Sequence, residues 1–291
     1  MNRPLAFVCA LLLAFVAVSS PCMAQAGHWI RFSLEPQRGN PAKIHADFRD
    51  EGDGANHNNW STGFMPSDLI GLDVSSFHGS SSRPFHFALV REAGRLDCTG
   101  VGENDHATGN CIFGENPDFI QLLVSNGIGR PNREQAFGLM AVNARRGTID
   151  ALTAAHYPMP TINALTALAA LGADGAYING MARAGYRPST IRSLIEFKAL
   201  EITPDWIAGF ARVGYANVPG EGLVQLRALG VTPEYIAGFQ RLGYRDLPVN
   251  QLVELKALDV TPEFVRNTIG SRSPMPPVNQ LVQLKMFGQR H

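Results

Sequence analysis

Histidine is concentrated in one part of this sequence. Six of the eight histidines fall within residues 27–114: His28, His45, His57, His78, His86 and His106. Imidazole and carboxylate groups are the ligands that zinc prefers in proteins. The segment contains no His-Glu-x-x-His motif and no pair of histidines at close ligand spacing. His86 lies between Phe85 and Phe87, which indicates the solvent face of a strand. We therefore expect neither a metal site nor another cofactor.

Other arrangements that could do chemistry are incomplete. Asp50–Gly54 combines carboxylates with glycines, as calcium loops do, but it lacks the spacing of an EF-hand. Ser80, Ser81 and Ser82 lie between His78 and His86 without a Gly-x-Ser-x-Gly nucleophile elbow. No phosphate-binding or dinucleotide-binding loop is present. A hydrolase with its site in the N-terminal segment, or at its junction with the rest of the chain, remains an alternative.

The composition excludes several classes of protein. The 291 residues carry 25 Lys and Arg against 25 Asp and Glu, and only 17% of residues are charged. This balance argues against a strongly basic nucleic-acid binder and against an acidic disordered tail. The length permits one or two domains with a sizeable core.

The N-terminus predicts export. Arg3 precedes a 14-residue apolar run, Leu5–Val18, and Ala24-Gln25-Ala26 supplies the small residues that signal peptidase requires. The run is shorter than the roughly 20 residues that span a bilayer. We expect residues 1–26 to be a cleaved signal peptide, leaving a periplasmic or secreted protein without a membrane span. Cys9 and Cys22 leave with this peptide.

The two remaining cysteines are expected to form a disulfide. Cys98 and Cys111 flank a glycine-bearing loop, and paired cysteines in an exported chain are usually oxidised. Residues 27–114 around them show apolar residues in alternation, which predicts strands near residues 30–34, 44–48, 85–89, 96–100 and 111–113. Residues 65–69 could form a helical turn, and residues 52–59 and 78–83 are expected to be loops. We predict a small antiparallel β domain over residues 27–114.

A 29-residue period fills the rest of the sequence. The segments that begin at Ile202, Val231 and Val260 share the pattern Thr-Pro-acidic-aromatic. Stepping by 29 residues defines six units: 115–143, 144–172, 173–201, 202–230, 231–259 and 260–288. Leucine recurs in three columns in the second half of the units, for example at 223, 226 and 229. A period this regular indicates stacked repeats.

Each unit is predicted to be a pair of short helices. Thr203 and Thr232 are suitable N-caps, with proline at the first helical position after them. Gly214 and Gly243 are suitable left-handed C-caps. We expect the leucine columns and the tyrosines after these glycines to be core. A single helical pair cannot bury both its apolar faces, so the sequence predicts an α-helical solenoid of six hairpins over residues 115–288. The complete chain is thus expected to be α+β.

The array resembles repeats found beside BlaR1-type sensors of the M56 metallopeptidase family. The resemblance rests on the pattern from Gly230 to Leu258 and on the segments 96–100 and 109–113, which are similar to a hairpin that precedes such arrays. It implies an exported bacterial helical-repeat protein. It does not imply peptidase activity, because the zinc motif and the membrane helices of that family are not in this sequence.

These features favour a non-enzymatic binding or scaffold protein that uses its repeat surface to bind other proteins. Binding residues in repeat proteins usually occupy exposed positions that vary between units. The candidates are Arg212, Asn217, Glu221, Gln240, Arg245 and Asn250. The alternatives are the hydrolase described above and an accessory component of a membrane sensor system.

Overall fold

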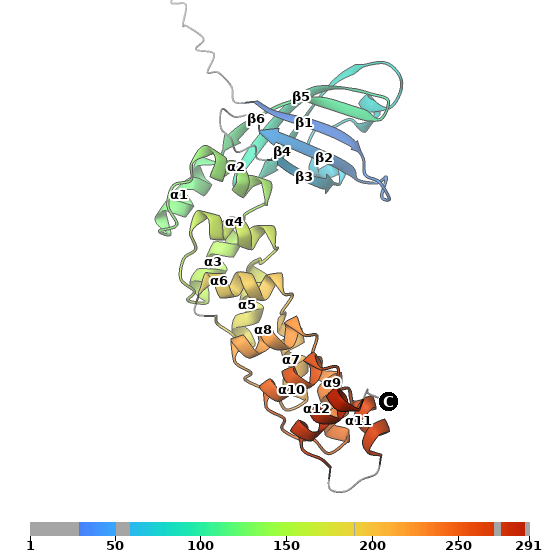
Figure 1. The fold of residues 1–291 in the computed structure, drawn as a ribbon. Coiled ribbons are helices and arrows are strands. Elements are labelled where there is room, and N and C mark those ends of the chain that lie inside the picture. The colour runs from blue at the N-terminus through green and yellow to red at the C-terminus, as the bar shows by residue number, and fades with distance from the viewer. Residues whose placement is uncertain (1–28, 51–58, 189, 271–274, 289–291) are drawn as a thin grey trace, which may run out of the picture.

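The chain combines a β-sheet with an extended set of helices (Figure 1). The structure is a computed structural model that describes residues 29–50, 59–188, 190–270 and 275–288. The expected signal peptide, residues 1–26, lies outside the described residues. The sheet forms one end of the molecule, and the helices lead away from it to the C-terminus. The predicted α+β class is confirmed.

Six strands form one antiparallel sheet with the order β3-β2-β1-β6-β5-β4. Their bounds are β1 Trp29–Pro36, β2 Ile44–Asp50, β3 Asn59–Phe64, β4 Arg83–Arg91, β5 Gly94–Glu103 and β6 His106–Glu115. Two short 3-10 turns, η1 Pro66–Asp68 and η2 Val74–Phe77, connect β3 to β4. The sequence predicted five of the strands and η1. It missed β3, because Asn-Trp-Ser-Thr-Gly-Phe lacks an apolar alternation; β3 is an edge strand held by its pairing with β2.

The two faces of the sheet differ in character. The inner face carries phenylalanines, and the ring of Phe32 lies 6.4, 6.0 and 5.2 Å from those of Phe48, Phe85 and Phe87. Cys98 and Cys111 are directly paired across β5 and β6 and form the predicted disulfide on this buried face. A disulfide that closes a loop of this length stabilises the fold by about 3 kcal/mol. The outer face remains open to solvent.

Twelve helices follow the sheet in the described part of the chain, two in each predicted unit. Their bounds are α1 Pro117–Ser125, α2 Arg133–Ala141, α3 Arg146–Ala154, α4 Ile162–Ala170, α5 Gly175–Arg183, α6 Ile191–Ala199, α7 Pro204–Arg212, α8 Gly220–Ala228, α9 Pro233–Arg241, α10 Val249–Ala257, α11 Pro262–Ile269 and α12 Val278–Phe287. Each helix begins 29 residues after its counterpart in the preceding unit. The helical pairs are therefore confirmed in number and position.

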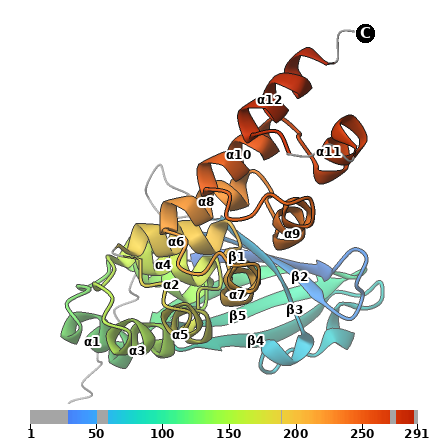
Figure 2. The same ribbon diagram turned by 90° about the horizontal axis from the view of Figure 1, so that it is seen from below.

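The helices lie in two rows. Figure 2 shows the even-numbered helices in one row and the odd-numbered helices beside it. Each odd-numbered helix from α3 onward packs against the next odd-numbered helix. The first leucine column is fully buried, as predicted, at Leu165, Leu194, Leu223, Leu252 and Leu281. The second column is buried at Leu168, Phe197, Leu226 and Leu255 and half-buried at Leu284 in the last unit. The third column belongs to the core only in part. Leu200 and Leu258 are half-buried and pack against the core, whereas Leu171, Leu229 and Phe287 are exposed, because this column falls at the helix C-termini.

The turn between β4 and β5 joins the sheet to the helices α2 and α3. Arg91 at the end of β4 donates from Nη1 to the carbonyl of Met140 at 2.8 Å and to that of Ala141, at the C-terminus of α2. Glu92 accepts from the backbone N–H of Arg146, at the N-terminus of α3, at 2.7 Å. A cation and a carboxylate thus meet the helix ends that favour each charge. Burial lowers the pKa of Arg91 to about 10, so that it is still charged at neutral pH.

Successive odd-numbered helices touch at glycine and proline. A Cβ atom added to Gly180 would lie 2.8 Å from Cγ of Pro204, the first residue of the next odd-numbered helix. Gly209 faces Pro233 and Gly238 faces Pro262 in the same manner. One unit earlier the same position is Ala151, and it faces Gly175 instead of a proline. At each of these four contacts, therefore, one residue is a glycine without a side chain and its partner is a proline or an alanine.

We expect the effect of Gly180→Ala on the free energy of unfolding to depend on the residue at position 204. Alanine in a helix interior normally stabilises by about 1 kcal/mol over glycine. Against Pro204 this gain is opposed by overpacking, which costs about 1–3 kcal/mol. In a Pro204→Gly background, which imitates Ala151 and Gly175, Gly180→Ala should be stabilising. Urea unfolding of the four members of this double-mutant cycle measures the coupling.

Gly138 in α2 provides the control for this cycle. An added Cβ atom at Gly138 would meet nothing within 4 Å, so Gly138→Ala should raise stability in either background. Additive effects of the Gly180 and Pro204 substitutions would contradict the proposed contact.

Candidate functional site

All six predicted binding residues lie at one edge of the helical array. Arg212, Asn217 and Glu221 span the turn from α7 to α8, and Gln240, Arg245 and Asn250 span the turn from α9 to α10. All are exposed except Gln240, which is half-buried. Its side-chain amide donates to the carbonyl of Val213 at 2.8 Å, so it joins the two turns.

Three tyrosines, of which Tyr244 is buried and Tyr186 and Tyr215 are half-buried, hold these turns side by side. The hydroxyl of Tyr186 donates to the carbonyl of Val218 at 2.9 Å, that of Tyr215 to Leu247 at 2.7 Å, and that of Tyr244 to Pro276 at 2.7 Å. Each bond reaches from the turn of one unit to the turn of the next. Burial raises the pKa of these three tyrosines, which keeps their hydroxyls protonated and able to donate. The sequence predicted that these tyrosines belong to the core and did not indicate their hydrogen bonds to the next unit.

Arginine dominates the exposed surface of these turns. We call this surface the arginine edge and define it by six exposed residues of the α5–α6, α7–α8 and α9–α10 turns: Arg183, Arg187, Arg192, Arg212, Arg241 and Arg245. None of the six forms an ion pair within the described residues. The same turns carry only two carboxylates, Glu221 and Asp246. The edge therefore presents unneutralised guanidinium groups to solvent.

The opposite edge, at the turns from even-numbered to odd-numbered helices, uses its cations differently. Lys198 lies 4.6 Å from the ring centroid of Tyr177, and Lys256 lies 5.1 Å from that of Tyr235. Arg227 lies over Trp206 and also bonds to Glu201 at 2.8 Å. Cations on this edge contact aromatic rings of their own unit, which is a structural role. These cations recur at one position of successive units, Lys198, Arg227, Lys256 and Lys285, but the sequence did not indicate their aromatic partners.

Two hollows lie along the arginine edge. The first has a volume of about 500 Å³ and lies between α6 and α8, where its lining includes Arg187, Ser193, Glu196 and Glu221. The helix α8 begins with Gly220, where α6 begins with Ile191, and a Cβ atom added to Gly220 would lie 3.1 Å from Cζ of Phe197, which also lines the hollow. The second, of about 560 Å³, is lined by Ala237, Gln240, Arg241, Arg245 and Asp246. Three of the six predicted residues thus line hollows.

Sequence reasoning missed four of the six residues of the arginine edge, Arg183, Arg187, Arg192 and Arg241. Arg183 and Arg241 occupy the same position of their units as Arg212, and Arg187 corresponds to Arg245. The search for positions that vary between units passed over residues that recur. A recurrent cation at the last helical position, outside the leucine columns, was the signal that could have identified them.

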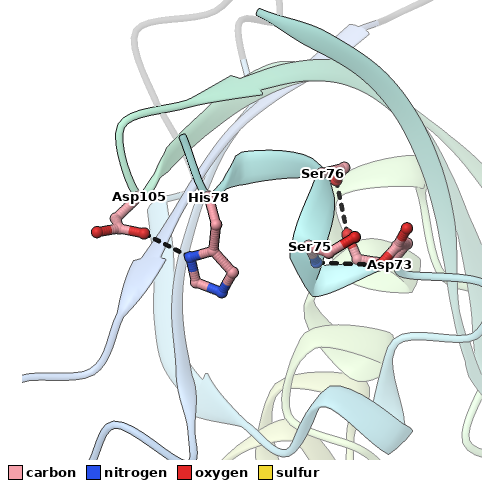
Figure 3. A network of polar contacts seen from close by, with 5 residues as sticks. All are labelled: Asp73, Ser75, Ser76, His78 and Asp105. Atoms are coloured by element: carbon pink, nitrogen blue, oxygen red, sulfur yellow. Dashed lines mark hydrogen bonds and ion pairs between the residues drawn. The ribbon is translucent and has the colours of Figure 1, made fainter. Parts of the chain in front are cut away.

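The histidines of the sheet are engaged separately. Nδ1 of His78 lies 2.5 Å from Asp105, whereas Nε2 of His45 lies 3.4 Å from Asp47 and 3.2 Å from the hydroxyl of Ser61. Figure 3 shows His78 turned toward Asp105, while Ser75 and Ser76 both contact Asp73. No serine in this view contacts the imidazole of His78. His86 lies on the outer face of the sheet, and His106 is exposed at the start of β6. His28 and His57 lie outside the described residues.

No cluster of three His, Cys, Asp or Glu side chains within the described residues has an arrangement that could hold a metal ion. None of the helices in these residues has both the length and the hydrophobicity of a membrane span. No family model matches the chain, and neither a curated protein nor a solved structure is significantly similar to it.

Proposed function

We propose that this chain is an exported, non-enzymatic binding and scaffold protein that binds acidic segments of other proteins along the arginine edge. The observation that carries the proposal is the row of exposed, unpaired arginines in three successive units. A guanidinium group binds carboxylates in a bidentate manner, and a row of them fits a partner with several acidic side chains.

The helical array is proposed to act as a solenoid. The regular spacing of the helices and the tyrosine hydrogen bonds between successive turns support this proposal. Such an array presents side chains at fixed intervals on an extended surface. A partner would then contact several units at once, which compensates for weak individual ion pairs at the surface.

Export is part of the same proposal. The apolar run of residues 5–18 is typical of a signal peptide. The disulfide between Cys98 and Cys111 is compatible with an oxidising compartment. We place the protein in the periplasm or outside the cell.

Charge reversal tests this function. We expect Arg212→Glu/Arg245→Glu to abolish the binding of a fluorescent peptide of ten glutamates, measured by anisotropy. The arginine edge then loses two of its six cations and gains two carboxylates, one of them in the second hollow. Binding by the unmodified protein should weaken as salt rises. The unmodified protein and the doubly substituted variant are then compared in cross-linked capture of partners from periplasmic extract.

Arg49→Glu is the matched control, since Arg49 is an exposed arginine of the sheet. It should leave both measurements unchanged. Equal capture by the unmodified protein and the doubly reversed variant would contradict the role of the arginine edge. Failure to capture any partner above background would contradict the scaffold function itself.

A further inference from the structure

The outer face of the sheet carries a groove that the proposed function does not use. The groove has a volume of about 630 Å³, within the usual range for small-ligand sites. It extends over β1, β6, β5 and β4 and onto Ile70, which pairs with Ala88 of β4 through two 2.8 Å hydrogen bonds. It therefore crosses five adjacent segments of backbone.

One row of side chains across the groove is mainly apolar. Trp29 is paired with Ile112, Ile112 with Asp97, Asp97 with Ala88 and Ala88 with Ile70. The indole of Trp29 and the side chain of Ile112 are 51% and 50% exposed. Ala88 is small and buried, so the row is deepest in front of it. The result is a mainly apolar floor, deepest at Ala88, with the exposed ring of Trp29 at one end.

The neighbouring row is polar. His86 is paired with Thr99 and Thr99 with Asn110, two residues along the strands from the apolar row. All three side chains are exposed, and none forms a hydrogen bond to another residue in the described ranges. Their donors and acceptors are thus available to a ligand that lies on the apolar floor.

The charges in the groove neutralise each other. Nε of Arg95 donates to both carboxylate oxygens of Asp97, at 2.7 and 2.8 Å. A charged ligand would find no counter-ion in this pair. An extended peptide is disfavoured too, because the backbone groups of the central strands are already paired and leave no open edge for it.

We infer that this groove binds a neutral oligosaccharide. A pyranose ring presents C–H groups on its face, which stack on an aromatic ring, and hydroxyl groups at its rim, which pair with polar side chains. Trp29 provides the ring, Ile112 and Ala88 provide the floor, and Asn110 and His86 provide the hydrogen bonds. The groove crosses four strands and the segment at Ile70, so it is long enough for several sugar units.

Titration of the mature chain with soluble hexasaccharides tests the inference. The probes are cellohexaose, maltohexaose and chitohexaose, with oligogalacturonate as the charged counterpart, and binding is followed by calorimetry. At least one neutral probe should bind saturably. Trp29→Ala should weaken that binding about tenfold or more, because it removes the aromatic ring of the groove, and Asn110→Ala should weaken it to a smaller extent.

Val101→Ala is the control, because Val101 is 49% exposed on the same face but lies outside the groove. It should bind as the unmodified protein does. The inference is overturned if none of the neutral probes binds, or if Trp29→Ala binds them with unchanged affinity. It is also overturned if only oligogalacturonate binds and Arg212→Glu/Arg245→Glu abolishes that binding, since the site would then be the arginine edge.

Discussion

Replacing Leu226 with alanine is expected to lower the free energy of unfolding by about 2–5 kcal/mol. Leu226 in α8 is fully buried and belongs to the second leucine column, with Leu168, Phe197 and Leu255. The substitution removes three carbon atoms from the space between the two rows of helices. The fixed 29-residue geometry on either side limits how far neighbouring units can close the cavity.

Gln225→Ala is the matched control for this prediction. Gln225 precedes Leu226 on the same helix but is exposed, and alanine is at least as favourable in a helix as glutamine. Urea unfolding followed by circular dichroism should show a change of no more than about 0.5 kcal/mol for Gln225→Ala. Similar losses for the two variants would mean that the inward face of α8 has been assigned incorrectly.

The repeat made most of the helical architecture predictable. A spacing of 29 residues, threonine or proline at helix starts and glycine at helix ends identified where the helices lie, because capping depends on local backbone chemistry. Gly185, Gly214 and Gly243 indeed adopt positive φ angles of 81°, 91° and 97°. The third leucine column was only partly predicted, because helical periodicity alone does not show where each helix ends and its side chains become exposed to solvent.

Features that depend on distant contacts were not predictable in this manner. The strand β3 lacks an apolar alternation and is defined by its partner β2. The tyrosine hydrogen bonds join residues 32 positions apart in neighbouring units. The recurrence of Arg183, Arg212 and Arg241 at intervals of 29 residues was visible in the sequence, but Arg187, Arg192 and Arg245 joined them on one edge only when the helix ends were placed side by side. The groove on the outer face combines residues from four strands and one bridge.

The contact between sheet and helices is the clearest example of such a distant contact. Arg91 lies 49 and 50 residues from the two carbonyls that it binds. Its guanidinium also lies 4.9 Å from the ring centroid of Trp60 and 5.7 Å from that of Phe64, so β4 approaches β3 although the two strands do not pair. One side chain thus holds both edges of the curved sheet against the end of α2.

We expect Arg91→Met to lower the free energy of unfolding by about 2–4 kcal/mol. Methionine retains apolar contact with Trp60, but the carbonyl of Ala141 loses its charged donor. The carbonyl of Met140 loses the same donor and keeps the backbone N–H of Asn143. A hydrogen bond from a charged group contributes about 1.5–3 kcal/mol, and a buried carbonyl left without a partner costs about 1–3 kcal/mol. The interaction of the cation with the two aromatic rings is lost as well. Urea unfolding measures the loss, and tryptophan fluorescence of the sheet compared with circular dichroism of the helices shows whether the two parts still unfold together.

Arg83→Met provides the comparison, because Arg83 begins the same strand and its side chain is exposed. It should change stability by no more than about 0.5 kcal/mol. For Arg91→Met, separate fluorescence and circular dichroism transitions would show that Arg91 couples the sheet to the array as well as stabilising each. If the two substitutions lower the free energy of unfolding equally, the hydrogen bonds from Arg91 to α2 stabilise the fold no more than an exposed arginine does. The main link between sheet and helices would then be Glu92 at the N-terminus of α3.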